Sequence, residues 1–417
     1  MALKVQYSPS CALLVHFKSR DLTRLHKHGR FWHIFLLGAS GDFEAAIISQ
    51  DEKDTWTVHL YLPLDADLSK IDSYDAIYRV LGGLYEPYHI EVDEILVRSA
   101  WRPNIAVART WTGSTGRVFL AGDAAHQNIP TGGYGMNMGI GDAFDLGWKL
   151  SSVINGQGGP GLLKSYELER KPVALRNVEH SGAHFNVHGG LKDLLTGGDP
   201  RRVDGDGEAA LALRKKIHEY YQLNDGENKD LGIEMGYRYN SPIVIRREDD
   251  GVEPEFTPHK YTPTTWPGSR APHLYFTNGT SIFDLFGKDW TLLVFANQEV
   301  GQTHLVTAAR ALGLSLCHVD LSGEDDAKRL YERSLVLVRP DHHVAWRAME
   351  LSSLEAAKDV LEVITGRLDS SPEQPSINQA SETVKAKDVL TPTVGIHSQA
   401  NNFPLERLAE SQQQIIG

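Results

Sequence analysis

"GRVFLAGDAAHQNIPTGGYGMNMGIGDAFDLGWKL", residues 116–150, is the stretch that decides the fold. We interpret "RVFLA" as a strand that ends near Asp123, where the sheets of α/β proteins present groups to ligands. Gly133 and Gly135 follow, and without a Cβ they let the backbone approach a flat ligand. We expect a helix from about Met136, whose free N–H groups and positive dipole end face that ligand. The stretch therefore predicts a ligand site in which the Asp123 carboxylate accepts hydrogen bonds from sugar-like hydroxyls.

The composition excludes several classes of protein. The chain has 417 residues, of which 41% are apolar, enough for a sizeable core and about two or three domains. Its formal net charge of −12 argues against nucleic acid as a partner. No run approaches the roughly 18 apolar residues that a membrane span needs, so we expect no membrane contact. Cys11 and Cys317 match neither a disulfide framework nor a zinc pattern, which favours a cytoplasmic location.

The sequence on either side of this stretch predicts one mixed α/β domain over residues 1–248. Upstream, β-branched and aromatic runs predict a largely antiparallel sheet, and one helix interrupts them near "SYDAIYRVLGG". These runs are "ALLVHF", "FWHIFLLG", "FEAAIIS" and "TWTVHLYL". Downstream, a helical pattern from Asp142 to about Val187 predicts two long helices joined by "NGQGGPG". A further helix is expected in "GEAALALRKKIHEYY", and "LGIEMGYRYNSPIVI" should return to extended structure.

The C-terminal third predicts a second, smaller domain. Residues 249–270 are rich in proline, threonine and acidic groups, which is typical of a linker. Residues 271–368 then follow the order βαβαββα of a thioredoxin-like domain, and the last helix should turn Leu354, Ala357, Leu361 and Ile364 inward. The Cys-x-x-Cys that disulfide exchange needs is replaced by "ANQEVGQ". Residues 369–417 are rich in serine, glutamine, proline and glutamate, and are predicted to be disordered.

Two further sets of side chains were weighed for chemistry. His126 is interpreted as a structural hydrogen-bonding residue, and the sequence analysis predicts no metal site. Trp101, Trp111 and the aromatic residues near Phe31 and Trp32 either line a substrate pocket or pack the sheet, and the sequence leaves both interpretations open.

The motif around Asp123 resembles that of a known family. It is similar to the second FAD-binding motif of single-component flavoprotein aromatic hydroxylases. The matching residues are Gly122-Asp123-Ala124-Ala125-His126, Pro130, Gly133, Gly135-Met136-Asn137, Gly139-Ile140, Asp142-Ala143 and Trp148-Lys149-Leu150. Similarity extends over about residues 10–368, and "YTPTTWPGSRAPH", "SIFDLFGKDWTLLVF" and "LVRPDHHVAWRA" resemble the phenol hydroxylase and chlorophenol monooxygenase branch.

The resemblance implies a role for each motif residue. Asp123, after Gly122, would bind the ribityl chain of FAD. Pro130 would pack beside the flavin, where Gly133 leaves room for it. The backbone of Gly135, Met136 and Asn137 would face the pyrimidine end of the ring.

The resemblance also implies a reaction. A phenolic or other aromatic small molecule would be hydroxylated with O2 and NAD(P)H, by a protein that forms a homodimer. The resemblance names neither the catalytic base nor the substrate, and it leaves the choice between NADH and NADPH open.

The sequence departs from this family at its first residues. Such hydroxylases open with a G-x-G-x-x-G turn for the FAD pyrophosphate, and the first residues here correspond to the middle of such an enzyme. We therefore expect an incomplete FAD site in the chain as encoded. The alternative function is a non-catalytic, truncated remnant that acts as a dimerising structural module.

Overall fold

The structure is a computed structural model. It describes residues 3–7, 10–29, 31–38, 43–51, 53–102, 104–196, 198–246, 251–296 and 299–368. The chain divides into two compact units, Met1–Ser370 and Ser371–Gly417, and everything below concerns the first. The tail predicted to be disordered lies outside the described residues.

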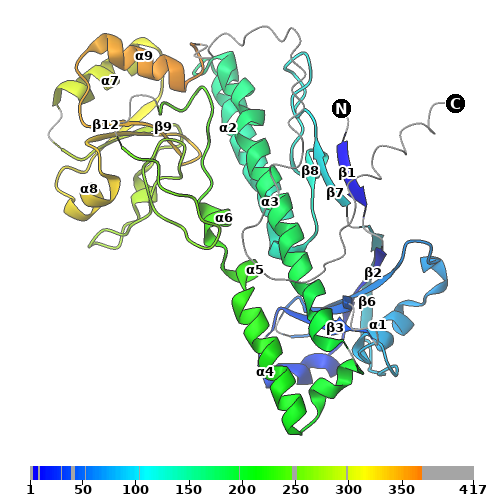
Figure 1. Ribbon diagram of the computed structural model, residues 1–417. Helices are drawn as coiled ribbons and strands as arrows, with labels where there is room; N and C mark the ends of the chain where they lie inside the picture. Colours follow the sequence, from blue (N-terminus) through cyan, green and yellow to red (C-terminus); the bar gives the residue numbers. More distant parts are fainter. Residues whose placement is uncertain are drawn as a thin grey trace, which may run out of the picture. The chain divides into compact units, whose positions relative to one another are not determined.

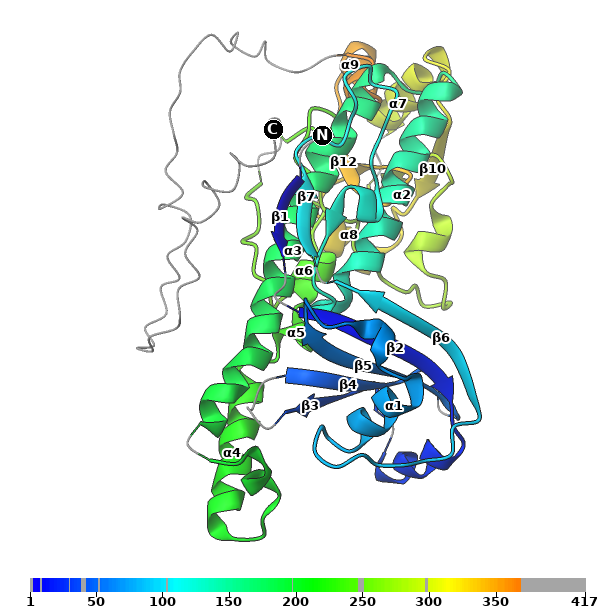
Figure 2. The ribbon, with the colours of Figure 1, turned by 90° about the vertical axis from the view of Figure 1, so that its right-hand side faces the viewer.

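An antiparallel sheet forms the N-terminal part, as predicted. Among the described residues its five strands lie in the order β3 (His33–Leu37), β4 (Phe43–Ser49), β5 (Thr55–Pro63), β2 (Ser10–Lys18) and β6 (Glu94–Trp101). Helix α1 (Ser73–Leu81) begins at the N-cap Asp72 and packs on one face of this sheet (Figure 2). Its Ala76, Ile77 and Val80 are buried against apolar residues of β2, β4 and β5. The other face of the sheet is turned away from α1.

A second, small sheet leads into the glycine-rich stretch. In the part of the chain that the structure describes, β7 (Asn104–Ala108) pairs antiparallel with both β1 (Leu3–Tyr7) and β8 (His126–Gln127). The predicted strand "RVFLA" is wrong: residues 117–121 are irregular apart from one isolated bridge between Thr112 and Phe119. No neighbouring strand offers this short run a ladder, so its β propensity is not realised.

Two long helices follow the glycine loop, as predicted. Helix α2 (Tyr134–Ile154) packs along α3 (Pro160–Leu195), which has 36 residues and is therefore about 54 Å long (Figure 1). One end of α3 lies against the C-terminal region, where Gly161 N–H donates to Gly366 O at 3.0 Å. Near its other end the His188 ring lies 4.8 Å from the Phe35 ring of β3. Helix α3 thus connects the two predicted domains.

Three shorter helices follow α3. They are α4 (Glu208–Leu223), α5 (Gly226–Lys229) and α6 (Leu231–Met235). The expectation of extended structure throughout "LGIEMGYRYNSPIVI" is therefore wrong at its start, where α6 forms and buries Gly232 and Ile233. Part of the predicted linker is buried too, because Thr264, Thr265 and Trp266 are each less than a tenth exposed.

The C-terminal elements occur in the predicted order βαβαββα. They are β9 (Trp290–Val294), α7 (Glu299–Ala311), β10 (Leu316–Asp320), α8 (Asp325–Tyr331), β11 (Leu335–Val338), β12 (Val344–Ala348) and α9 (Leu354–Ile364). Strand β9 is central: it pairs parallel with β10 and antiparallel with β11, and β12 pairs with β11. Ala357, Leu361 and Ile364 face inward as predicted, whereas Leu354 is 46% exposed because it is the first residue of its helix.

No helix within the described ranges combines the length and the apolar character that crossing a membrane requires.

Candidate functional site

The N-terminal end of α2 is built as a ligand-facing helix end. Its N-cap, Gly133, has the left-handed conformation φ 66°, ψ 19°, which a residue without Cβ adopts at little cost. No side chain caps the helix there, and a Cβ built on Gly133 would meet no described atom within 4 Å. The first-turn N–H groups and the positive end of the helix dipole are therefore available to a ligand.

The loop before α2 is tied to other elements. Thr131 Oγ1 donates to Ser181 O of α3 at 2.6 Å, and Gly132 N–H donates to Glu227 Oε1 of α5 at 3.0 Å. Gly132 also has a positive φ of 81°. These contacts fix the position from which α2 starts.

All seven predicted flavin-binding residues lie around this helix end. Gly122 and Asp123 belong to a short 3-10 helix, and Pro130 is the N-cap of another that leads into Gly133. The other three, Gly135, Met136 and Asn137, occupy the first turn of α2, which starts two residues earlier than predicted. The Asn137 side chain donates to Gly133 O at 2.9 Å rather than into solvent.

Asp142 is the residue that joins the Asp123 segment to α2. Its Oδ2 accepts from Gly122 N–H at 3.1 Å and lies 2.7 Å from His126 Nε2, while Oδ1 accepts from Arg170 Nε at 2.8 Å. Burial alone would raise the pKa of Asp142, but His126 and the Arg170 guanidinium hold it below its usual value. His126 is thus a structural hydrogen-bonding residue, as predicted.

Two glycines make this junction close. A Cβ on Gly139 of α2 would lie 3.4 Å from Gly122 Cα, and Gly122 itself has a φ of 56°. Asp123, next to Gly122, is exposed, and only its backbone carbonyl has a hydrogen bond among the described residues, from Gln127 Nε2 at 3.3 Å. The carboxylate is therefore free to accept hydrogen bonds from a ligand.

Comparisons with known proteins find family models and relatives that match this chain. The family described as "FAD binding domain" matches residues 4–181, and "Aromatic-ring hydroxylase, C-terminal" matches residues 264–367. The FAD-dependent monooxygenase opdD of Penicillium oxalicum is 45% identical over 368 residues, which are 86% of this chain and 70% of that relative. The chain belongs to the family of FAD-dependent aromatic-ring hydroxylases.

Other members of the hydroxylase family agree. The FAD-dependent monooxygenase apdD of Emericella nidulans is 45% identical over 366 residues, 85% of this chain and 58% of the relative. The flavin-dependent monooxygenase PieE, solved in complex with FAD and substrate, is 30% identical with a TM-score of 0.74. The match covers 87% of this chain and 66% of the PieE chain. RebC with bound 7-carboxy-K252c is 31% identical with a TM-score of 0.71, and the match covers 88% of this chain and 66% of the RebC chain. The chain thus spans 58% to 70% of the length of these relatives.

The residues at the start of α2 fit the flavin that the family binds. The space at Gly133, which any side chain would fill, leaves room for a flat ring. Uncapped helix N–H groups suit a ring edge that carries negative charge. The structure adds a contact that sequence analysis missed: a Cβ on Gly135 would lie 3.2 Å from Asn128 Oδ1, so this glycine also makes room for Asn128.

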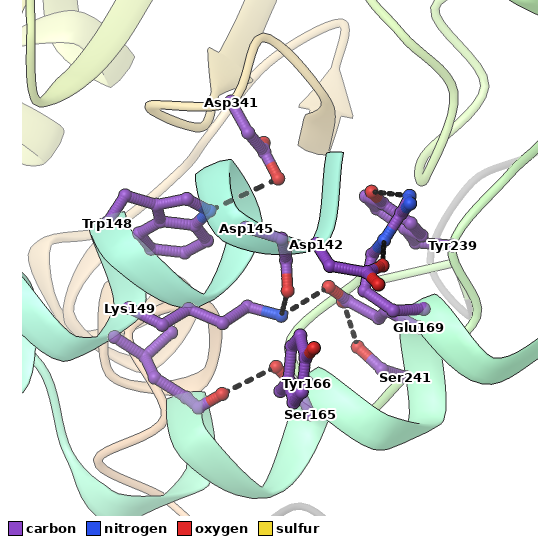
Figure 3. A network of polar contacts seen from close by, with 12 residues as sticks. Asp142, Asp145, Trp148, Lys149, Ser165, Tyr166, Glu169, Tyr239, Ser241 and Asp341 are labelled. Atoms are coloured by element: carbon purple, nitrogen blue, oxygen red, sulfur yellow. Dashed lines mark hydrogen bonds and ion pairs between the residues drawn. The ribbon is translucent and has the colours of Figure 1, made fainter. Parts of the chain in front are cut away.

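The C-terminal half of α2 has a different environment. Lys149 Nζ lies between two buried carboxylates, 2.8 Å from Asp145 Oδ2 and 2.7 Å from Glu169 Oε2 of α3 (Figure 3). Trp148 Nε1 donates to Asp341 Oδ2 at 3.2 Å, and Ser241 donates to Glu169 at 2.6 Å (Figure 3). These residues belong to the interior and not to the ligand-facing end.

Arg339, at the end of β11, completes this buried network. Its guanidinium donates to both oxygens of Glu169 at 2.8 Å and to Asp145 and Asp341. Burial, with the Glu169 charge nearby, raises the pKa of Asp145 to about 7. Burial would raise the pKa of Glu169 as well, but Arg339 and Lys149 hold it at about 2. The network ties α2 and α3 to the β11–β12 connection.

The face of the five-stranded sheet opposite α1 carries aromatic groups. The rings of His59, Tyr61 and Trp101 lie 6.2 to 6.4 Å from one another. Burial lowers the pKa of His59 to about 4 and raises that of Tyr61 to about 12, so both side chains are neutral near pH 7. By contrast Trp111 is fully buried in the core beside α2, and Trp32 is 69% exposed. Of the candidate aromatic residues named from the sequence, Trp101 lies on this face, and so does Phe35, because its pairing partner Ala46 is itself paired with His59.

The sequence analysis missed a group of histidines and carboxylates beside the glycine loop. His184 Nε2 of α3 lies 3.0 Å from the Tyr134 hydroxyl, and His188 Nε2 lies 2.7 Å from Glu227 Oε2. Burial, followed by the Asp230, Glu234 and Glu227 carboxylates, raises the pKa of Tyr134 and keeps its phenol neutral. The available signal was the four-residue spacing of the histidines in "EHSGAHFNVHGG", which puts their side chains on one face of a helix.

Proposed function

We propose that this chain acts as an FAD-dependent monooxygenase on a phenolic or other electron-rich aromatic compound. One atom of O2 enters the substrate as a hydroxyl group, the other leaves as water, and NADH or NADPH supplies the two electrons. The observation that carries the proposal is the uncapped start of α2, with open space at Gly133 and the exposed Asp123 carboxylate beside it. Bound FAD would supply the reaction with O2.

Each predicted residue has a defined task in this proposal. Asp123 accepts hydrogen bonds from the ribityl hydroxyls, and Pro130 packs beside the ring. The N–H groups of Gly135, Met136 and Asn137 face the pyrimidine end, where the helix dipole stabilises negative charge. Asp142 acts through other groups, because it fixes Gly122 and thereby positions Asp123.

The substrate belongs on the face of the five-stranded sheet opposite α1. His59, Tyr61 and Trp101 offer neutral aromatic surface there, which suits a flat aromatic compound. The phenol hydroxylase branch, the homodimer and the cytoplasmic location stay predictions from the sequence.

An oxygen-uptake assay tests this function. The full chain is supplied with excess FAD, NADH or NADPH and a panel of phenols, and oxygen uptake is measured together with the hydroxylated product. We expect product that depends on FAD and substrate, and a raised KM in Tyr61→Ala. Tyr275→Ala, an exposed tyrosine of the C-terminal region, should leave KM unchanged. Absence of product with every phenol, from a chain that binds FAD, contradicts the proposed substrate class.

A further inference from the structure

Helix α3 presents three histidines to α5 and to Asp230, the residue between α5 and α6. His180, His184 and His188 recur at four-residue intervals and so share one face of the helix. Across from the first two lies Asp230, which joins α5 to α6 and is 3% exposed. His259 Nδ1 is within hydrogen-bonding distance of the other oxygen of this carboxylate.

The spacing of these groups is too wide for hydrogen bonds and suits an ion between them. Asp230 Oδ2 lies 4.0 Å from His180 Nδ1 and 3.8 Å from His184 Nε2, and all three atoms lie within 4.8 Å of one another. Hydrogen bonds end at about 3.2 Å between such atoms. Ligand atoms around a tetrahedral Zn²⁺ bound at about 2.0 to 2.1 Å lie about 3.3 Å apart. Small side-chain rotations would bring these atoms to that separation.

The charges around Asp230 also call for a cation. Its ion-pair partners in the described part of the chain are all imidazoles, with no lysine or arginine among them. A buried carboxylate without a lysine or arginine partner gains a compensating charge when a divalent ion binds beside it.

We propose that His180, His184 and Asp230 bind a divalent transition-metal ion, with Zn²⁺ as the first candidate. Two imidazole nitrogens and one carboxylate oxygen form a donor set of borderline softness, which favours Zn²⁺ over Mg²⁺ or Ca²⁺. The Tyr134 hydroxyl, now 3.0 Å from His184 Nε2, turns away from that nitrogen when the ion binds.

The ion would clamp α3 to the segment before α6. The same region already holds the glycine loop, through Thr131 to Ser181 and through Gly132 to Glu227, which in turn contacts His188. The proposed metal site therefore supports the loop from which α2 begins. Its existence does not depend on flavin binding, because none of its three ligands belongs to the predicted flavin-binding set.

Metal titration of the full chain, without an affinity tag and after treatment with a chelator, tests the site. We expect one Zn²⁺ per chain by calorimetry, and visible absorption bands when Co²⁺ is the probe. His180→Ala and the double variant His180→Ala/His184→Ala should weaken Zn²⁺ binding on the order of 100-fold. Two controls should bind as the unmodified chain does: His188→Asn, one helical turn away, and His218→Ala, which is exposed on α4.

Each outcome decides the proposal. Absence of Zn²⁺ and Co²⁺ binding to the unmodified chain overturns it, as does equal binding by the His180→Ala variant. Loss of binding in His218→Ala would show adventitious surface binding and would also overturn it. Circular dichroism of the metal-free variants establishes folding. If the double variant unfolds, the single variant His180→Ala decides the test, because His180 is only partly buried.

Discussion

The two ends of α2 differ in nearly every physical property, although one sequence motif spans both. At the N-terminal end Met136 and Asn137 are exposed, Met136 by 74%, and the helix has no side-chain cap. In the C-terminal half Asp145 and Lys149 are almost wholly buried and paired with groups from α3 and the β11–β12 connection, whereas the last residue, Ile154, is 80% exposed. The N-terminal end is open to a ligand, and the segment 145–149, called the locked end below, is fixed in the interior.

This difference separates two reasons for a residue to belong to the motif. The residues around Asp123 and Gly133 fit a cofactor, because they leave backbone N–H groups and space open. The Trp148-Lys149-Leu150 end fits no ligand, since Trp148 and Lys149 make buried polar contacts with Asp341 and Glu169. A motif match alone therefore does not assign a ligand contact to each of its members.

The largest expected effect is at the locked end. Glu169→Gln should lower the free energy of unfolding by about 3 to 5 kcal/mol, because it leaves Lys149 and Arg339 without their shared counter-charge. Asp145→Asn should cost less than half as much, since the pKa of Asp145 is raised to about 7 by burial and its charge is already partly lost at neutral pH. Urea denaturation of both variants measures the difference. Equal losses would mean that the two carboxylates have the same charge state.

The second effect is on the pH dependence of stability. A pKa of about 7 means that the folded chain binds the Asp145 proton more tightly than the unfolded chain does. This contribution is complete below the unfolded pKa of 3.8 and is lost as the pH rises toward 7. Glu169 acts in the opposite sense, because its pKa of about 2 makes its contribution complete above 4.5 and lost as the pH falls.

Between pH 5 and 7 the difference between the unmodified chain and Asp145→Asn should therefore come from Asp145, because His59, whose pKa burial lowers to about 4, contributes to both. Over these two pH units the unmodified chain should lose about 2 kcal/mol of unfolding free energy relative to Asp145→Asn. Denaturation of both proteins at the two pH values gives this number, and superimposable pH profiles would refute the raised pKa.

The third effect is at the open end. Asp123→Ala should weaken flavin binding by about 1.5 to 3 kcal/mol, the range for a charge-assisted hydrogen bond. Its free energy of unfolding should stay within about 0.5 kcal/mol, because the side chain is exposed. Asp206→Ala, which removes an exposed carboxylate before α4, is the matched control for a nonspecific charge effect. Fluorescence titration with FAD measures the affinity of both variants. Unchanged affinity in Asp123→Ala would remove this residue from the site.

The smallest effect concerns the backbone at the start of α2. Gly133→Ala should cost about 1 kcal/mol of stability, because its φ of 66° is unfavourable for a residue with a Cβ. Gly207→Ala is a close control, since Gly207 is also a helix N-cap but has a φ of −80°. Thermal denaturation of the pair isolates the strain, and equal stability would show that the loop adopts another conformation.

Sequence analysis predicted those parts that rest on local signals. The strands of the first sheet, the order βαβαββα and the position of α2 follow from apolar periodicity and from glycine spacing. The prediction of a strand at residues 117–121 was wrong because pairing depends on a neighbouring strand that the sequence does not reveal. Arg339 and Glu169 lie 170 residues apart, so their ion pair was not predictable from spacing. The group of His180, His184 and Asp230 was not predicted for the same reason, although the spacing of its histidines was visible in the sequence.

Hydrogen exchange of the α2 backbone tests whether the flavin binds at the N-terminal end of the helix. The full chain is compared with and without a saturating concentration of FAD, and amide exchange is followed over residues 131–150. We expect slower exchange for the first turn of α2, residues 134–137, and no change over residues 145–150, which are already locked. Unchanged exchange at residues 134–137 in a chain with bound FAD would contradict the assignment of the flavin to this end of the helix.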